Sequence, residues 1–148
     1  MARFKGSFKY SMDTKGRVAL PAPFRKILES EDATEVTAVP GMHNALYLFT
    51  EDAFDAWVDS FYANDGGYDT SNPRHLEIDE FLYSNSFALK LDSAGRINIP
   101  QDLREKCGLE KDVTIVGRRD HMELFDSAVF EARAAAAPTL DELVFKRA

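Results

Sequence analysis

The stretch DTKGRVALP at residues 13–21 returns as DSAGRINIP at residues 92–100. Each copy follows a run in which apolar and polar residues alternate, the pattern of a half-buried strand. An aspartate followed three positions later by glycine is typical of a type I turn, with Asp at its first and Gly at its fourth position. Glycine also adopts positive φ without a steric cost. The sequence therefore predicts the same turn twice, at residues 13–16 and 92–95.

The apolar residues around the two turns correspond position by position. The corresponding pairs are Phe8 and Phe87, Tyr10 and Leu89, Met12 and Leu91, Val18 and Ile97, Leu20 and Ile99, and Phe24 and Leu103. We expect the runs on either side of each turn to form a β-hairpin with one apolar face. Because a unit of about 60 residues is marginal on its own, the two copies are expected to share one core.

Composition and turn residues divide the chain into four parts. A first unit covers residues 4–62, and a loop with a helix covers residues 63–83. A second unit covers residues 84–133, and a helical tail with a Thr-x-x-Glu capping box covers residues 134–148. Strands and short helices are mixed within each unit, so the predicted fold class is α+β.

Helix start signals stand at matching places in both units. Thr50 and Asp126 are the expected N-caps, and a phenylalanine before each cap matches one at the fourth helical position, as in a hydrophobic staple. Asn72, followed by proline, predicts a further helix that runs to about residue 83.

The charge of the chain is unevenly distributed. The net charge is −7, but residues 1–30 carry seven basic and two acidic side chains, a sum of +5. The other 118 residues carry 11 basic and 23 acidic side chains, a sum of −12. This asymmetry predicts either a cationic surface for an anionic partner or an ordinary solvated surface.

The residue pattern gives no support to enzymatic chemistry. His43, His75 and His121 are far apart in the sequence, without ligand-spaced partners, and are expected in loops or at the surface. Cys107 is the only cysteine, and it is expected to be an ordinary helix-end residue rather than a nucleophile. No metal, cofactor or small-molecule substrate is therefore expected. With no possible internal disulfide, no signal peptide and no run of about 18 apolar residues, the chain is expected to be cytoplasmic, with no membrane partner.

The repeated stretches resemble a known family. FKYSMDTKGRVALPAPFR at residues 8–25 returns as FALKLDSAGRINIPQDLR at residues 87–104, which GLEKDVTIVG follows at residues 108–117. Two Asp-x-x-Gly-Arg units at this spacing, on one apolar frame, are similar to the MraZ family of bacterial transcriptional regulators. The resemblance covers residues 4 to about 133. It implies two tandem AbrB-like units that interleave and close a swapped-hairpin β-barrel flanked by short helices.

The resemblance also implies a function. The chain is expected to bind double-stranded DNA at short direct repeats upstream of its own operon of cell-division and cell-wall genes. It is expected to be associated with the nucleoid. It is also expected to assemble with itself into a closed ring of about eight to twelve subunits, an octamer or a dodecamer.

The family motif assigns expected roles to individual residues. Arg17 is expected to contact DNA, while Asp13 and Gly16 shape the turn. Candidate phosphate contacts are Lys15, Lys9, Arg3 and Lys5.

The second copy departs from the first. Ala94 stands where the first copy has Lys15, and residues 80–108 carry four basic and four acidic side chains. Arg96 is therefore expected to be structural and to pair with Asp92, beside Gly95. An alternative function remains open, namely a ring-forming scaffold whose basic N-terminal end binds an acidic partner.

Overall fold

Strands and helices follow one another in the same order in both halves of the chain. The structure is a computed structural model and describes residues 3–146. The first half contains β1 (Ser7–Ser11), β2 (Arg17–Ala19), α1 (Ala22–Ser30), β3 (Glu35–Pro40), β4 (Leu46–Phe49) and α2 (Glu51–Ser60). The second half contains β5 (Phe87–Lys90), β6 (Arg96–Asn98), α4 (Gln101–Lys106), β7 (Asp112–Arg118), β8 (His121–Asp126) and α5 (Ser127–Ala136). Between the halves lies α3 (Pro73–Ser84), and short helical turns occur at η1 (Met42–Asn44), η2 (Ala63–Asp65) and η3 (Asp141–Phe145).

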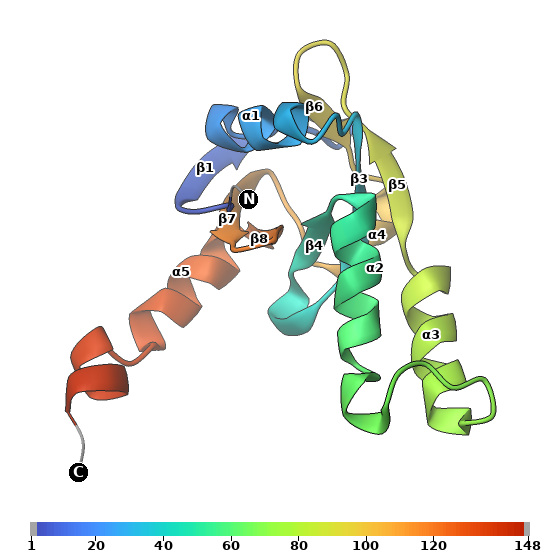
Figure 1. Ribbon diagram of the computed structural model, residues 1–148. Coiled ribbons are helices and arrows are strands. Elements are labelled where there is room, and N and C mark those ends of the chain that lie inside the picture. The colour runs from blue at the N-terminus through green and yellow to red at the C-terminus, as the bar shows by residue number, and fades with distance from the viewer. Residues whose placement is uncertain (1–2, 147–148) are drawn as a thin grey trace.

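The fold is α+β, with two antiparallel sheets and helices around them (Figure 1). The larger sheet has the strand order β1-β7-β8-β4-β3-β5, and the smaller sheet pairs β2 with β6. Strands pair mostly between the halves. The first strand of each half lies beside the third strand of the other, because β1 pairs with β7 and β5 pairs with β3. Neither half could complete its sheet alone.

Two sequence-based expectations about the sheets are wrong. Strands β1 and β2 do not pair as a hairpin, nor do β5 and β6, because each strand finds its partner in the other half. Only the turns close locally, through a hydrogen bond from Asp13 N–H to the Arg17 carbonyl at 3.0 Å and from Asp92 N–H to the Arg96 carbonyl at 2.9 Å. The expected closed β-barrel is not found either. Within residues 3–146 the larger sheet ends at free edges, β1 and β5.

The main core lies where the two halves interleave. Most of the alternating residues that are predicted to point inward are buried, but Phe8, Tyr10 and Leu91 are only partly buried and Phe87 is 44% exposed, so the predicted apolar frame is confirmed in part. The most deeply buried of these, at 1% exposure or less, are Val18, Leu20, Phe24, Ile97, Ile99 and Leu103. Val18 stands opposite Ile97 in the β2–β6 pair.

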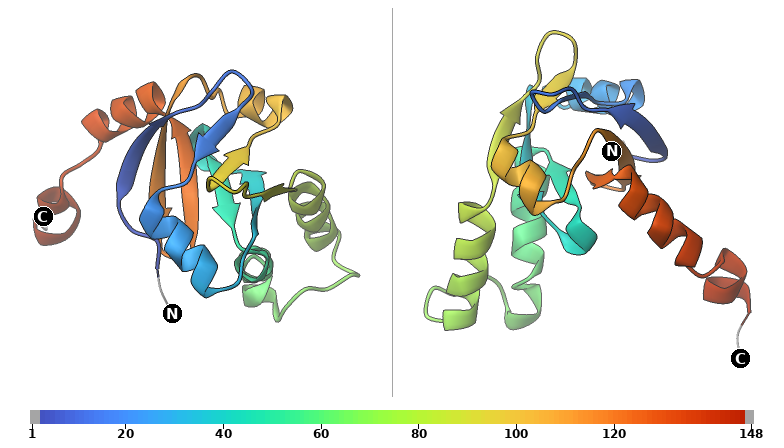
Figure 2. Two further views of the ribbon diagram at one scale, coloured as in Figure 1. Left: turned by 90° about the horizontal axis from the view of Figure 1, so that it is seen from above. Right: turned by 180° about the vertical axis from the view of Figure 1, so that it is seen from behind.

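Helices α2 and α3 lie side by side and extend away from the sheets (Figures 1 and 2). A second apolar cluster fixes them to β3 and β4 and includes Phe49, Phe54 and Tyr62. The predicted caps are confirmed here. Thr50 Oγ1 accepts a hydrogen bond from Ala53 N–H at 3.3 Å, and the Asn72 side chain caps the start of α3.

Asp126 stands at the N-cap position of α5 as expected, but without the expected side-chain bond. The Asp126 side chain makes no capping bond to α5 and accepts a hydrogen bond from Glu110 N–H at 3.1 Å instead, which ties the helix start to the loop before β7. Phe125 and Phe130 nevertheless pack as predicted, with ring centroids 5.4 Å apart.

The C-terminal part of the chain forms an arm. Helix α5 points away from the body and carries η3 at its far end (Figure 1). Every residue from Glu131 to Lys146 is exposed. The expected capping box begins the last turn, where Glu142 N–H donates to Thr139 Oγ1 at 3.2 Å. Residues 147–148 of the expected tail lie outside the described residues. None of the helices within residues 3–146 combines the length and apolarity needed to cross a membrane.

Candidate nucleic-acid interface

The first turn is held together by Asp13. Its Oδ1 accepts hydrogen bonds from Lys15 N–H at 3.0 Å and Arg17 N–H at 2.8 Å, and its Oδ2 accepts one from Arg17 Nε at 2.7 Å. Gly16 completes the turn at φ +86°. The hydrogen bond from the Arg17 backbone lowers the pKa of Asp13 most, burial opposes it, and the bonds from the Arg17 side chain and the Lys15 backbone add to the lowering, so the pKa is lowered overall. The carboxylate therefore stays ionised and fixes the stem of Arg17.

The second turn repeats this geometry. Asp92 Oδ1 accepts hydrogen bonds from Ala94 N–H and Arg96 N–H, each at 2.9 Å, and its Oδ2 accepts one from Arg96 Nε at 2.9 Å. The side chains of Arg17 and Arg96 are 37% and 38% exposed. The two arginines thus agree in pairing and exposure. What distinguishes the turns is the neighbouring residue, a lysine in the first and an alanine in the second.

Each turn is bound to the end of a strand from the other half. Leu20 N–H donates to the Gly95 carbonyl at 3.0 Å, and Ile99 N–H donates to the Gly16 carbonyl at 2.9 Å. Because β2 and β6 are antiparallel, with Arg17 opposite Asn98 and Ala19 opposite Arg96, the two turns lie at opposite ends of this strand pair.

Two arginines that the sequence analysis did not assign to the site support this arrangement. Arg25 Nε donates to the Leu20 carbonyl at 3.1 Å, and Arg104 Nε donates to the Ile99 carbonyl at 3.0 Å. Each guanidinium packs on the glycine of the other half's turn. The repeat could have identified them, because Arg25 and Arg104 occupy matching positions at the ends of the two repeated stretches, residues 8–25 and 87–104.

The five predicted DNA contacts do not form one group. Lys15 is exposed beside Arg17 in the first turn. Lys9 lies within β1 and forms an ion pair with Glu131 of α5, and the hydrogen bond and charge of Glu131 raise the pKa of this lysine. Lys9 therefore brings no free positive charge to the turn.

Arg3 and Lys5 lie at the far end of β1 from the turns. They flank Phe4, whose backbone is hydrogen-bonded to Arg119 at the tip of the β7–β8 hairpin. From Phe4 to Ser11 the chain spans roughly 20 Å at the rise of an extended strand. The basic N-terminal residues thus divide between two ends of β1. At the far end they are joined by basic residues of the hairpin, Arg118 and Arg119.

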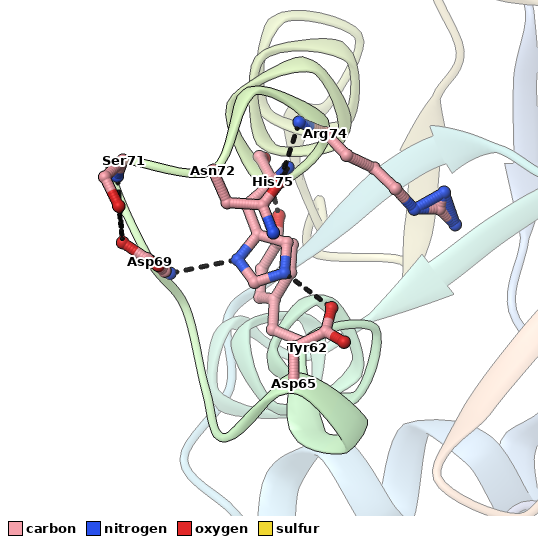
Figure 3. Close-up of polar contacts among 7 residues, drawn as sticks. All are labelled: Tyr62, Asp65, Asp69, Ser71, Asn72, Arg74 and His75. Carbon is pink, nitrogen blue, oxygen red and sulfur yellow. Dashed lines mark hydrogen bonds and ion pairs between the residues drawn. The ribbon is translucent and has the colours of Figure 1, made fainter.

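The expectation of a loop or surface position is wrong for His75. The residue is 1% exposed and closes the connection between α2 and α3 (Figure 3). Its Nδ1 accepts a hydrogen bond from Asp69 N–H at 3.0 Å, so Nε2 carries the proton and donates to Asp65 Oδ2 at 2.8 Å. Beside it, burial and the nearby Asp79 raise the pKa of Tyr62 to about 12. These contacts account for His75 as a structural residue.

His121 is also partly buried rather than at the surface. Its ring stacks on Phe49, with centroids 4.7 Å apart, and is hydrogen-bonded to Glu123 at 2.8 Å and Asp120 at 3.0 Å. Burial favours the neutral ring, but the bonds and charges of Glu123 and Asp120 outweigh it and raise the pKa of His121.

Cys107 is buried at the end of α4, and burial raises the pKa of its thiol to about 11. The thiol therefore remains protonated at neutral pH, as expected for a structural cysteine. Among residues 3–146, no three side chains of His, Cys, Asp or Glu are arranged to hold a metal ion.

Comparison with known proteins identifies the family of this chain. The family model described as "MraZ protein, putative antitoxin-like" matches residues 3–66 and 82–141. This chain belongs to the MraZ family. It is 32% identical over 134 residues to the Transcriptional regulator MraZ of Burkholderia cenocepacia strain J2315, which covers 90% of this chain and 89% of the relative.

Other MraZ relatives are similar over most of their length. The Transcriptional regulator MraZ of Ruegeria pomeroyi is 30% identical over 152 residues, covering 95% of this chain and 89% of the relative. That of Mycoplasmoides gallisepticum is 28% identical over 128 residues, covering 86% and 84%. These relatives are named as regulators, so the MraZ family is not one of enzymes. The matched ranges leave out residues 67–81, which contain much of α3, and 142–148, which contain most of η3.

Proposed function

We propose that this protein is a sequence-specific DNA-binding transcriptional regulator, cytoplasmic and associated with the nucleoid. Its targets are short direct repeats upstream of its own operon of cell-division and cell-wall genes. The observation that carries this proposal is the first turn, in which Asp13 holds Arg17 beside the exposed Lys15 and which Ile99 of the other half binds at Gly16. The interleaved turns would serve as an AbrB-like swapped-hairpin DNA-binding unit. Membership of the MraZ family supports the same function.

Arg17 is suited to read a base edge. Its Nε is engaged by Asp13, and the two terminal amino groups of its guanidinium form no hydrogen bond with residues 3–146. A guanidinium with free terminal groups can donate two parallel bonds to O6 and N7 of guanine in the major groove. Lys15, one of the flanking residues, would contact the phosphate backbone as a point charge.

A single turn offers too little positive charge for strong binding to DNA, because Lys9 is paired and Arg3 and Lys5 lie at the far end of β1. We infer that a ring of subunits presents several turns at once. Direct repeats spaced by one helical turn, about 10 bp, face one side of the duplex. Linked weak contacts then add up to high avidity.

The test is a mobility-shift titration of the protein on duplex DNA from upstream of its own gene, against scrambled duplex of equal length. Preferential binding to the upstream duplex is the expected result. Insertion of half a helical turn between repeats should weaken binding strongly, because alternate sites then face away from the ring. Equal affinity for the upstream and scrambled duplexes would overturn sequence-specific regulation.

The alternative is a ring-forming scaffold whose basic end binds an acidic partner. The separation of Arg3 and Lys5 from the turns favours it, because at the hairpin end of β1 they lie near Arg119 and form a second basic group, while Arg118 there is paired with Glu123. Weak binding that is equal on both duplexes would support the scaffold over the regulator.

A further inference from the structure

Two groups of large apolar side chains are exposed on this molecule. The apolar tail, at the end of the C-terminal arm, consists of Leu140, Leu143, Val144 and Phe145. The helical face, on α2, α3 and their connection, consists of Phe61, Tyr68, Leu76, Phe81 and Tyr83. Of the exposed large hydrophobic residues within 3–146, only Met42 and Phe87 belong to neither group. Exposed apolar groups of this size mark interaction surfaces.

Within residues 3–146 the apolar tail has no packing partner. Leu143 is 67% and Phe145 is 72% exposed, and the tail forms a single helical turn. A turn this short is not stable in water without tertiary contacts. A partner surface is therefore needed to order it.

The helical face of the same chain is out of reach of the tail. The arm leaves the body on the opposite side from α2 and α3, in each of the views (Figures 1 and 2). Helix α5, of ten residues, carries the tail about 15 Å further outward. A second copy of the chain could meet the tail with its own helical face.

The charges favour such an encounter. Residues 51–83, which form α2, α3 and their connection, contain nine acidic residues and only one basic residue, Arg74. The apolar tail contains Asp141 and Glu142 in its first turn, and Lys146 and Arg147 follow it in the sequence. The cationic residues directly after Phe145 are complementary to an acidic surface that exposes apolar side chains.

We propose that the apolar tail of one copy packs on the helical face of the next copy. The proposal rests on the ring of the proposed function and names the surfaces that join its subunits. Because the two surfaces differ and lie at opposite ends, the contact is head-to-tail, and it can repeat until the ring closes. Much of each surface lies outside residues 3–66 and 82–141, so the family match does not account for the contact.

The experiment uses full-length variants on each side of the contact. The tail variant combines Leu143→Asp with Phe145→Asp, and the face variant combines Leu76→Asp with Phe81→Asp. Met42→Asp is the control, because Met42 is 66% exposed and belongs to neither surface. Light scattering at micromolar concentration measures the mass, and circular dichroism checks the fold. If an aspartate variant unfolds, the same positions are changed to serine.

We expect the tail variant and the face variant each to be monomeric, and the control to assemble like the wild type. An equimolar mixture of the two variants retains one intact tail and one intact face. It should therefore form a dimer of about 33 kDa, twice the 16.6 kDa chain. A tail that packs on another tail could not give this dimer.

Three results would overturn the contact. They are a tail or face variant that assembles like the wild type, a mixture that stays monomeric, or a control that also dissociates. In the first case the ring of the proposed function stands and only its surfaces change. A monomeric wild type would overturn both the ring and this contact, whereas sequence-specific DNA binding is measured separately by mobility shift.

Discussion

Arg104 of the second half packs directly on Gly16 of the first turn. A Cβ at Gly16 would stand 2.8 Å from Arg104 Nε and 2.6 Å from the Ile99 carbonyl oxygen. Arg25 packs on Gly95 in the same way. The glycine of each turn therefore leaves room for the other half of the chain, so the turns and the interleaving of the halves depend on each other.

We expect Gly16→Ala to lower the free energy of unfolding. An L-residue at φ +86° costs about 1–2 kcal/mol, and the contact with the Ile99 backbone adds to this because a backbone oxygen cannot move aside easily. Gly95→Ala should cost less, since the atoms it meets belong to the flexible side chain of Arg25. Equilibrium urea unfolding measures both differences.

Gly66→Ala is the matched control. Gly66 has φ +85°, but a Cβ there would meet no atom within 4 Å, so its replacement measures the backbone strain alone. A loss of stability in Gly16→Ala no larger than that in Gly66→Ala would contradict the close packing between the halves.

Arg17→Ala should abolish detectable specific DNA binding while leaving the ring intact. Loss of a bidentate base contact costs about 1–3 kcal/mol per engaged subunit, and the losses accumulate over several subunits. Arg96→Ala should leave DNA affinity per ring nearly unchanged, because Ala94 replaces the lysine beside it. Titrations on the upstream duplex at two salt concentrations measure both.

The pair Arg17→Ala and Arg96→Ala is well matched. The two side chains have the same partner type, nearly the same Nε–Oδ2 distance and nearly the same exposure. Any difference in DNA affinity then reflects the surroundings of the turns. Equal losses from both substitutions, with both rings intact by light scattering, would refute the division of roles.

Local features of this fold were predictable because they depend on a few neighbouring residues. The Asp-x-x-Gly spacing sets the turns, and the alternation around Val18 and Ile97 sets the buried face. Thr50 and Asn72 cap their helices because their oxygens accept bonds from nearby N–H groups.

Strand partners were not predictable in the same way. A turn between two alternating runs favours a hairpin. The residues around the turn do not indicate that β1 pairs instead with β7, a longer strand far away in the sequence. Asp126 likewise has the composition of a cap, yet a residue sixteen positions away takes its carboxylate. In both cases a contact with a residue far away in the sequence replaces the local contact that the sequence pattern favours.

The sequence predicts the residues of the turn motif, but it does not predict which charged residues from other elements lie around them. Arg17 and Lys15 lie together because four residues of one turn place them. Lys9 was counted as a free cation, although α5 brings Glu131 to it from the other half of the chain. The net charge of a sequence stretch does not show which of its basic residues form ion pairs with acidic residues elsewhere in the chain.

We expect His75→Leu to loosen the connection between α2 and α3. The change removes the acceptor for Asp69 N–H and the donor to Asp65, and a buried group left without its bond costs about 1–3 kcal/mol. Hydrogen exchange of the Asp69 amide should accelerate. Thr70→Ala is the control in the same loop, because Thr70 is exposed and its replacement should change stability by at most about 0.5 kcal/mol. Unchanged protection of the Asp69 amide in His75→Leu would contradict this role.

The last prediction concerns the pH dependence set by His121. Its raised pKa in the folded state means that protonated His121, bonded to Glu123 and Asp120, stabilises the fold. This contribution is fully present below the ordinary pKa of 6.5 and is lost as the pH rises through the raised value. The stability difference between wild type and His121→Gln should therefore be larger at about pH 5.5 than at about pH 8.5.

Stacking of the His121 ring on Phe49 contributes at every pH, so only the change in the difference with pH reports the charge. His43→Asn provides the control, because His43 is exposed and asparagine tolerates its φ of +61°. Urea unfolding of the three proteins across this pH range makes the measurement. If the difference in free energy of unfolding between wild type and His121→Gln grows as the pH rises, burial of the ring lowers the pKa of His121 by more than Glu123 and Asp120 raise it.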